Sequence, residues 1–143
     1  SKMKILFVCL GNICRSPLAE GILRQINPNI IVDSAGTSNY HIGSPPDKRM
    51  IQTAKSFNID ISNLVARQFK KEDFNRFDKI FVMDDENYTN VIALAESESH
   101  IKKVYYTLSK QNNVPDPYFG GQDGFIRVYK MLNDACLKIN DEI

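Results

Sequence analysis

Residues 5–17 of this chain have the sequence Ile5-Leu6-Phe7-Val8-Cys9-Leu10-Gly11-Asn12-Ile13-Cys14-Arg15-Ser16-Pro17. The first four form an apolar run with the length of a buried parallel strand. Ser16 is predicted to cap a helix and Pro17 to take its first position; the apolar face of that helix is Leu18, Ile22, Leu23 and Ile26. A loop between strand and helix can point backbone N–H groups at an anion. The stretch therefore predicts a strand, an anion-binding loop that starts with a thiol, and a helix.

Strand and helix patterns alternate along the rest of the chain. Strands are expected at residues 4–8, 30–32, 79–83 and 104–107, and helices at 16–26, 47–57 and 84–95. Residues 37–46 and 108–122 are expected as loops, and a last helix carries Phe125, Val128, Tyr129, Leu132, Cys136 and Ile139 on one face. This order predicts a three-layer α/β/α fold, flavodoxin- or Rossmann-like, with a four-stranded parallel sheet. Such sheets bind ligands beyond the carboxyl ends of their strands, where the Cys9 loop is expected.

The composition is that of an ordinary globular protein, with 43% hydrophobic and 24% charged residues. We expect one domain over residues 1–143, with Ser1-Lys2 before Met3 as a tag remnant. A net charge of +1 argues against a nucleic-acid partner. No apolar run reaches the roughly 18–20 residues of a membrane span, and no signal peptide is recognised. Three cysteines, an odd number without the spacing of a disulfide framework, indicate a reducing, cytoplasmic setting. A monomer is expected, because the sequence shows no sign of an oligomer interface.

Cys9 is the candidate nucleophile. A cysteine after a strand is usually an inert buried residue, but here Arg15 and a helix N-terminus would stabilise the reactive thiolate. The planar fork of Arg15 can bind two phosphoryl oxygens at once, and the backbone N–H groups of the loop can hold the others. The spacing of Cys9 and Arg15 therefore predicts a phosphate-binding loop, with inorganic phosphate or a similar oxyanion as a ligand.

The other loop residues have expected parts in the same site. Gly11 would let the backbone approach the ligand, and Asn12 tolerates a left-handed conformation. Ser16 can donate its hydroxyl to the Cys9 sulfur, a role compatible with capping the helix. Leu10, Ile13 and Cys14 complete the loop.

Asp116 is the candidate proton donor for a leaving group. It lies in Val114-Pro115-Asp116-Pro117-Tyr118-Phe119-Gly120-Gly121, a loop stiffened by prolines, although Asp-Pro alone is typical of a turn. An aspartic acid buried near a phosphate would stay protonated for transfer. The two histidines, His41 and His100, are expected at the surface. Three aromatic side chains could line a narrow cleft for the flat aromatic ring of a substrate: Tyr40, Tyr118 and Phe119.

Four blocks of sequence resemble the low-molecular-weight protein tyrosine phosphatase family. They are Val8 to Pro17, Asp33-Ser34-Ala35-Gly36-Thr37, Ala66-Arg67-Gln68 with Phe77-Asp78 and Met83-Asp84, and Asp116-Pro117-Tyr118. The resemblance implies hydrolysis of phosphotyrosine proteins and small aryl phosphates, in the manner of an acid phosphatase, without metal or cofactor. A cysteinyl-phosphate would form on Cys9, with Arg15 as the phosphate clamp and Asp116 as the acid and base.

The resemblance also implies supporting roles. Asn12, Ser16 and Ser34 would hold the loop by hydrogen bonds, and Cys14 would form a protective disulfide with the nucleophile, which implies redox regulation. The chain departs from the family at three places: Tyr40 replaces a frequent Trp, Asn63-Leu64-Val65 replaces a segment with a supporting His, and Tyr118-Phe119 replaces paired tyrosines.

Two alternatives compete with this hypothesis. An arsenate reductase on the same fold would need further cysteines in the middle of the chain, and none lies between Cys14 and Cys136. Cys136 falls on the inward face of the last helix and is interpreted as core. A non-catalytic phosphate-binding regulatory module would be expected to lack the nucleophile or the acid, whereas Cys9 and Asp116 are both present.

Overall fold

A four-stranded parallel sheet forms the centre of the computed structural model, which describes residues 2–108 and 112–143. The strand order is β2-β1-β3-β4. The strands are β1 (Lys4–Cys9), β2 (Ile31–Gly36), β3 (Lys79–Val82) and β4 (Val104–Tyr106). The helices are α1 (Arg15–Ile26), α2 (Lys48–Ser56), α3 (Asp73–Arg76), α4 (Asp85–Ile92), α5 (Glu98–Ile101) and α6 (Gln122–Glu142). The predicted three-layer α/β/α fold is confirmed.

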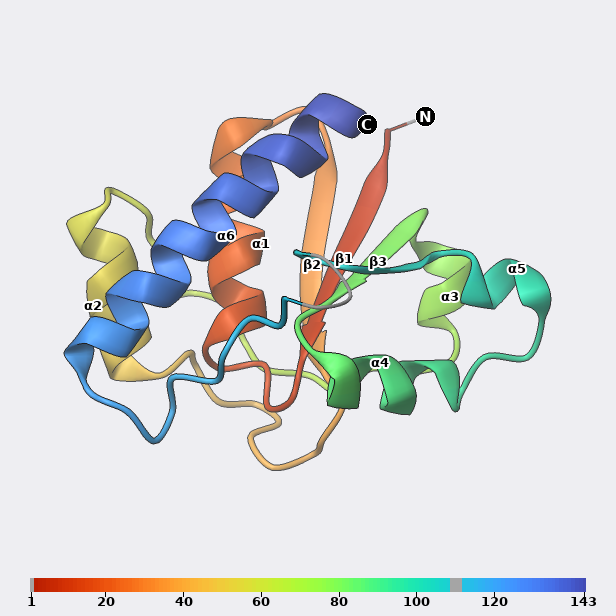
Figure 1. Ribbon diagram of the computed structural model, residues 1–143, viewed down its shortest axis with the longest axis horizontal. Helices are drawn as coiled ribbons and strands as arrows, with labels where there is room; N and C mark the ends of the chain where they lie inside the picture. The colour runs from red at the N-terminus through yellow and green to blue at the C-terminus, as the bar shows by residue number, and fades with distance from the viewer. Residues whose placement is uncertain (1, 109–111) are drawn as a thin grey trace.

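Helices cover both faces of the sheet (Figure 1), with α1, α2 and α6 on one side and α3, α4 and α5 on the other. Successive side chains of a strand point to opposite faces, so β1 contributes to two separate cores. Ile5, Phe7 and Cys9 pack in the core with α1 and α6, whereas Leu6 and Val8 pack in the other. This alternation directs the Cys9 sulfur toward the side of the sheet that carries α1.

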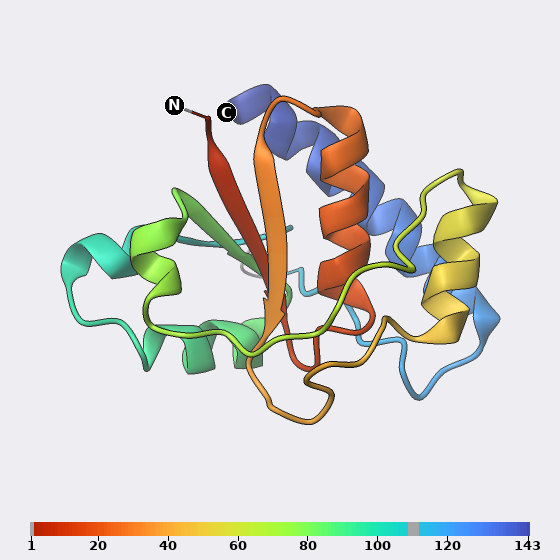
Figure 2. The ribbon, with the colours of Figure 1, turned by 180° about the vertical axis from the view of Figure 1, so that it is seen from behind.

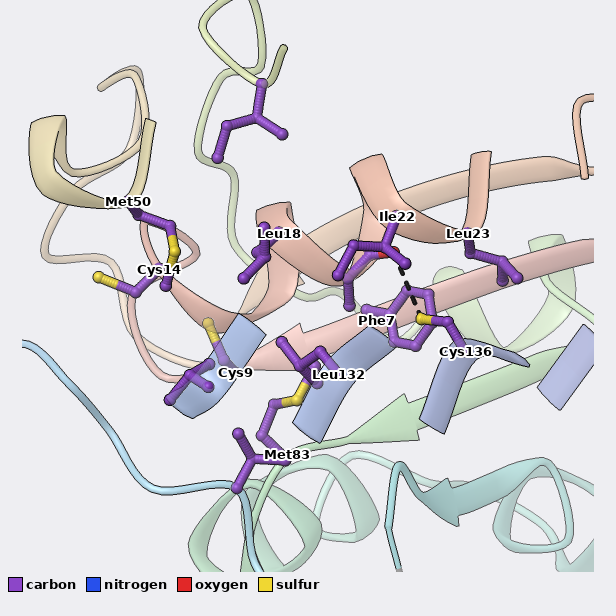
Figure 3. Close-up of a cluster of buried hydrophobic side chains, with 14 of the residues drawn as sticks. Phe7, Cys9, Cys14, Leu18, Ile22, Leu23, Met50, Met83, Leu132 and Cys136 are labelled. Carbon is purple, nitrogen blue, oxygen red and sulfur yellow. Dashed lines mark hydrogen bonds between the residues drawn. The ribbon is translucent and has the colours of Figure 1, made fainter. Parts of the chain in front are cut away.

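The larger core is built from aromatic, aliphatic and sulfur side chains of β1, α1 and α6 (Figure 3). Phe7, Leu18 and Leu132 are fully buried, and each such side chain contributes about 1.5–3 kcal/mol by leaving water. Cys136 lies in the same core, as predicted, where its thiol donates to the Ala19 carbonyl at 3.8 Å. Burial raises the pKa of Cys136 to about 12, so the thiol stays protonated.

The start of α1 differs from the prediction. The helix begins at Arg15 with Cys14 as its N-cap, so Ser16 is not the cap and Pro17 is the third helical residue. The physical reason is that the Ser16 hydroxyl is bonded to the Cys9 sulfur instead of to a backbone N–H group. Pro17 is still tolerated, because N–H groups of the first turn have no partner within a helix.

Other differences concern short elements. β2 runs to Gly36, four residues beyond the predicted strand at 30–32, and helices α3 and α5 were not predicted because four residues show no clear periodicity. His100, expected at the surface, is buried in α5 with its ring stacked on Phe74 at 4.6 Å. The predicted loop over 108–122 includes residues 109–111, which lie outside the described residues.

The loops that follow β1 and β2 meet at the carboxyl end of the sheet (Figure 1), opposite the end where β1 starts and α6 ends. Figure 2 shows the segment between α2 and α3 crossing the carboxyl ends of the strands to reach the other layer. Three segments distant in sequence therefore come together around Cys9. Among the described residues, no helix is long and apolar enough to cross a membrane.

Candidate active site

A cavity of about 150 Å³ opens at the carboxyl end of β1. It is lined by Cys9, Leu10, Gly11, Ile13, Cys14, Arg15, Tyr40, His41, Asp116, Tyr118 and Phe119. The structure thus brings most of the predicted site residues to one cavity. Asn12, Ser16 and Ser34 do not line it but lie directly behind the loop, where they are buried.

The Cys9 sulfur sits at the base of the candidate phosphate-binding loop, which comprises residues 9–16. Its Sγ lies 3.0 Å from the Ser16 hydroxyl and accepts the Asn12 backbone N–H at 3.3 Å. Only 3% of Cys9 is exposed. The sulfur is thus contacted by two polar groups, and the contact with Ser16 was expected from the sequence.

Asn12 fixes the hydrogen-bond directions behind the loop. It adopts the predicted left-handed conformation, with φ of 58°, and its Oδ1 accepts the backbone N–H of Arg67 at 3.0 Å. Its Nδ2 therefore donates to Ser16 at 2.8 Å and to Ser34 at 2.9 Å. Because Ser16 accepts this hydrogen bond, its own proton is available for the Cys9 sulfur.

Glu20 ends this network and was missed by the sequence analysis. Ser34 accepts from Asn12, so its proton goes to Glu20 Oε1 at 2.6 Å. Glu20 also pairs with Arg24 at 2.5 Å. Burial raises the pKa of Glu20, an effect that the hydrogen bond from Ser34 and the charge of Arg24 offset only in part. The sequence feature that could have identified Glu20 is an acidic residue one helical turn after Ser16, in a largely apolar helix.

Residues 63–65 are where the sequence departs from the family. Leu64 in this segment is partly buried and packs against the larger core. The Arg67 backbone N–H, three residues after Leu64, donates to Asn12 Oδ1.

Arg15 is fixed in a buried position beside the cavity, with 2% exposure. Its NH1 donates to Asp84 at 2.7 Å and to the Val114 carbonyl at 2.9 Å. Burial opposes the charge of Arg15, but the nearby Cys9 and Asp84 outweigh burial and raise its pKa. Asp84 also caps α4 by accepting the Asn87 backbone N–H, so Arg15 is oriented by a rigid element.

Asp116 is not buried, which contradicts the sequence prediction. Its side chain is 36% exposed, and its Oδ2 lies 3.8 Å from Arg15 NH2. Its Oδ1 accepts the Tyr118 backbone N–H at 3.0 Å. Asp116 thus lines the cavity while part of its carboxylate meets solvent.

Aromatic side chains surround the mouth. Tyr40 is 73% exposed and Phe119 93% exposed, so both project from the surface instead of packing in a core. His41, expected at the surface, lines the cavity with its ring 6.2 Å from that of Tyr118. A Cβ on Gly11 would lie 2.9 Å from the His41 ring, so this glycine makes room for a side chain of the mouth.

Gly36 supports the loop from below and was also missed. It lies opposite Cys9 in the parallel register of β1 and β2. A Cβ at this position would lie 2.7 Å from the Leu10 carbonyl oxygen and 3.0 Å from the Asn12 nitrogen, both backbone atoms. In the sequence, Gly36 lies four residues beyond the predicted strand, so nothing indicated that it would pair with Cys9.

Cys14 lies in the wall of the cavity as a free, buried thiol. Burial, together with the charge of Asp47, raises the pKa of Cys14, so its thiol is protonated at neutral pH. Figure 3 shows Cys9 and Cys14 at the same end of the larger core, with Met50 beside Cys14. The two thiols thus have different surroundings: Cys9 has hydrogen-bond donors and Cys14 has a carboxylate nearby.

Comparisons with known proteins agree with this geometry. The profile of the family described as low molecular weight phosphotyrosine protein phosphatase matches residues 4–143. The human protein of that name is 41% identical over 143 residues, covering 92% of this chain and 90% of its own.

Two solved structures are also similar. The Entamoeba histolytica protein tyrosine phosphatase with Hepes in its active site gives a TM-score of 0.90 at 41% identity, covering 99% of this chain and 97% of that one. Vibrio vulnificus Wzb in complex with benzylphosphonate gives 0.92 at 29% identity, covering 100% of both chains. Because the family profile spans residues 4–143 and the human relative is 41% identical over 92% of the chain, the chain belongs to the low molecular weight phosphotyrosine protein phosphatase family.

Proposed function

We propose that this protein hydrolyses phosphotyrosine in proteins or peptides, and small aryl phosphates, through a phosphoenzyme on Cys9. The observation that supports this best is the convergence of three groups on one small cavity: the hydrogen-bonded Cys9 sulfur, the buried Arg15 guanidinium and the Asp116 carboxyl. Each group matches one requirement of phosphoryl transfer, namely a nucleophile, a cation for the equatorial oxygens and an acid for the leaving group.

In the first step, the Cys9 thiolate attacks phosphorus and the bond from phosphorus to the ester oxygen breaks. The departing phenoxide takes a proton from Asp116, which becomes a carboxylate. Arg15 and the backbone N–H groups of the loop stabilise the charge on the three transferring oxygens, because these donors are already oriented before the reaction starts.

In the second step, water attacks the cysteinyl-phosphate. Asp116 accepts a proton from that water, the bond between sulfur and phosphorus breaks, and inorganic phosphate leaves. The Ser16 hydroxyl, whose proton is directed to the sulfur because Asn12 donates to its oxygen, stabilises the thiolate that departs. Nucleophile and acid are thereby restored.

The aromatic mouth supports a preference for aryl esters. Tyr40, Tyr118 and Phe119 can contact the flat ring of phosphotyrosine while its phosphate reaches Cys9. The benzylphosphonate in the Wzb complex is a ligand of that kind in a related protein. A serine phosphate would leave these contacts unmade, so we infer weaker activity toward it.

We further propose reversible redox control. A peroxide would convert the Cys9 thiolate to a sulfenic acid, and the Cys14 sulfur would then displace water to form a disulfide; a thiol reductant restores both cysteines. Cys9, Cys14 and Cys136 are free. Free thiols fit a reducing compartment, so we infer that the protein acts in the cytoplasm. We also propose that it is a monomer with one domain over residues 1–143.

The test is phosphate release from a panel of phosphotyrosine peptides, phosphoserine peptides and p-nitrophenyl phosphate. Wild-type protein should prefer aryl esters, and Cys9→Ser should abolish turnover while still binding phosphotyrosine peptides. Turnover that survives in Cys9→Ser would refute the phosphoenzyme. Arsenate reduction is measured in parallel with a thiol donor; we expect none, because Cys136 is fully buried against α1 and cannot reach the cavity.

A further inference from the structure

The loop that carries Asp116, here called the acid loop and comprising residues 115–121, has few connections to the rest of the fold. Just before it, the Val114 backbone N–H donates to the Met83 carbonyl at 2.8 Å. Within it, Gly120 N–H donates to the Pro117 carbonyl at 3.0 Å. At its end, the Gly121 carbonyl accepts the Gly124 backbone N–H of α6 at 3.1 Å. Among residues 2–108 and 112–143, no other backbone hydrogen bond joins residues 115–121 to another segment. The position of residues 115–120 therefore depends on side-chain contacts, one of which is the ion pair between Arg15 and Asp116.

Arg49, in α2, makes further side-chain contacts with the acid loop. Its NH2 donates to the Tyr118 carbonyl at 2.8 Å and its NH1 to the Gly120 carbonyl at 3.4 Å. Its guanidinium carbon also lies 5.6 Å from the centre of the Tyr118 ring and 4.7 Å from that of Phe125, at the start of α6. One side chain thus contacts the acid loop through two carbonyls and one ring.

Arg49 is itself held against the phosphate-binding loop. Its Nε donates to Asp47 Oδ1 at 3.1 Å and its NH2 to Asp47 Oδ2 at 2.9 Å. The Asp47 backbone N–H donates to the Ile13 carbonyl at 2.8 Å. A chain of contacts therefore runs from Ile13, in the loop that surrounds the nucleophile, through Asp47 and Arg49 to the loop of the acid.

We infer that Arg49 is a positioning residue for proton transfer, which sets where Asp116 stands relative to Cys9. The inference rests on the proposed function, in which Asp116 protonates the leaving group. An arginine suits this position because its planar fork offers five N–H donors in fixed directions, enough for a carboxylate and two carbonyls. A lysine would keep the positive charge but would lack the planar guanidinium with its several N–H donors in fixed directions. Asp116 then depends on a residue 67 positions earlier in the chain.

The inference predicts a selective defect. Arg49→Met keeps an unbranched apolar stem and removes all donors. For aryl phosphates with weakly acidic leaving groups, kcat/KM should fall about 10- to 100-fold, part of the roughly 10²–10⁴-fold that a general acid contributes. For leaving groups such as p-nitrophenol, which depart without a proton, the fall should stay within about threefold. Inhibition by inorganic phosphate should be unchanged, since the phosphate-binding loop keeps its residues.

A double variant separates positioning from a general structural role. If Arg49 acts through Asp116, then Arg49→Met added to Asp116→Ala should lower kcat/KM no further than Asp116→Ala alone. Arg49→Lys should recover part of the loss, and Lys55→Met, on an exposed residue of the same helix, is the matched control with wild-type kinetics.

Equal losses of kcat/KM across all leaving groups, or losses that multiply in the double variant, would overturn the inference. Urea unfolding checks that each variant is folded; if Arg49→Met does not fold, the same comparison is made with Arg49→Lys, whose loss should show the same leaving-group dependence. Failure of the proposed function is a separate result, because it would appear in the wild-type protein as absent turnover or in Cys9→Ser as turnover that persists.

Discussion

Gly36→Ala tests whether the phosphate-binding loop rests on the end of β2. The backbone at Gly36 is in an extended strand, a conformation that alanine also adopts, so the substitution adds one methyl group without backbone strain. That methyl would lie 2.7 Å from the Leu10 carbonyl oxygen, about 0.7 Å short of the 3.4 Å at which ordinary contact begins. The atoms in its way are backbone atoms of the loop and cannot rotate aside.

Two magnitudes follow from this geometry. Overpacking of a filled site costs about 1–3 kcal/mol, so the free energy of unfolding should fall by that amount. The loop must shift by a large part of the missing distance, and a displacement of about 1 Å at a reacting group can cost about 10²-fold in rate. We therefore expect kcat/KM for p-nitrophenyl phosphate to fall about 10- to 100-fold, with weaker inhibition by inorganic phosphate.

The assay combines urea unfolding with steady-state kinetics on Gly36→Ala and on a matched control, Gly124→Ala. A Cβ on Gly124 would meet only the Pro117 Cβ at 3.9 Å, an ordinary contact. Because Gly124 is helical, alanine there should stabilise the protein by up to about 1 kcal/mol and leave activity unchanged. Wild-type kcat/KM in folded Gly36→Ala would refute the close contact between β2 and the loop.

Two further predictions concern the buried network. Ser34→Ala leaves one N–H of Asn12 and Oε1 of Glu20 without a partner, which should lower the free energy of unfolding in urea by about 2–3 kcal/mol and reduce kcat; unchanged stability would contradict the network. Glu20→Gln tests a pH dependence: because burial raises the pKa of Glu20, the native state holds this proton more tightly than the unfolded state. The contribution of Glu20 to stability should therefore decline as pH rises above its ordinary value of 4.5, and this slope should be absent in Glu20→Gln when unfolding is measured from pH 4 to 7. Parallel stability profiles of the two proteins would show that the carboxyl does not titrate differently on folding.

The fold and the centre of the site could be predicted because their signals are local. The apolar run before Cys9 and the repeated change from strand to helix imply a parallel sheet, and short connections fix which ends of the strands carry the loops. Cys9 to Ser16 likewise form one continuous segment, so the left-handed Asn12 and the contact of Ser16 with the Cys9 sulfur were expected from the sequence and are present in the structure.

Other parts of the site could not be predicted because they depend on contacts between distant segments. Glu20 looks like one polar residue of a helix until Ser34, from another strand, donates to it. The sequence-based argument for a protonated Asp116 assumed that this residue is buried, whereas its side chain is 36% exposed, which depends on how the acid loop packs. Arg49 has no distinguishing sequence signal, because its contacts with the acid loop are to the backbone carbonyls of Tyr118 and Gly120 and to the Tyr118 ring, about 70 residues away in the chain.

The sequence alone determined the order of strands and helices and the chemistry of the Cys9 loop, since periodicity and short-range spacing are properties of a continuous segment. Only the tertiary structure decided that this loop is supported by Gly36 of β2 and by the hydrogen bonds of Asn12, Ser34 and Glu20, and that Arg49 contacts the acid loop. The physical reason is that hydrogen bonds and close contacts act over a few ångströms. Residues far apart in the chain acquire them only when folding brings their segments together.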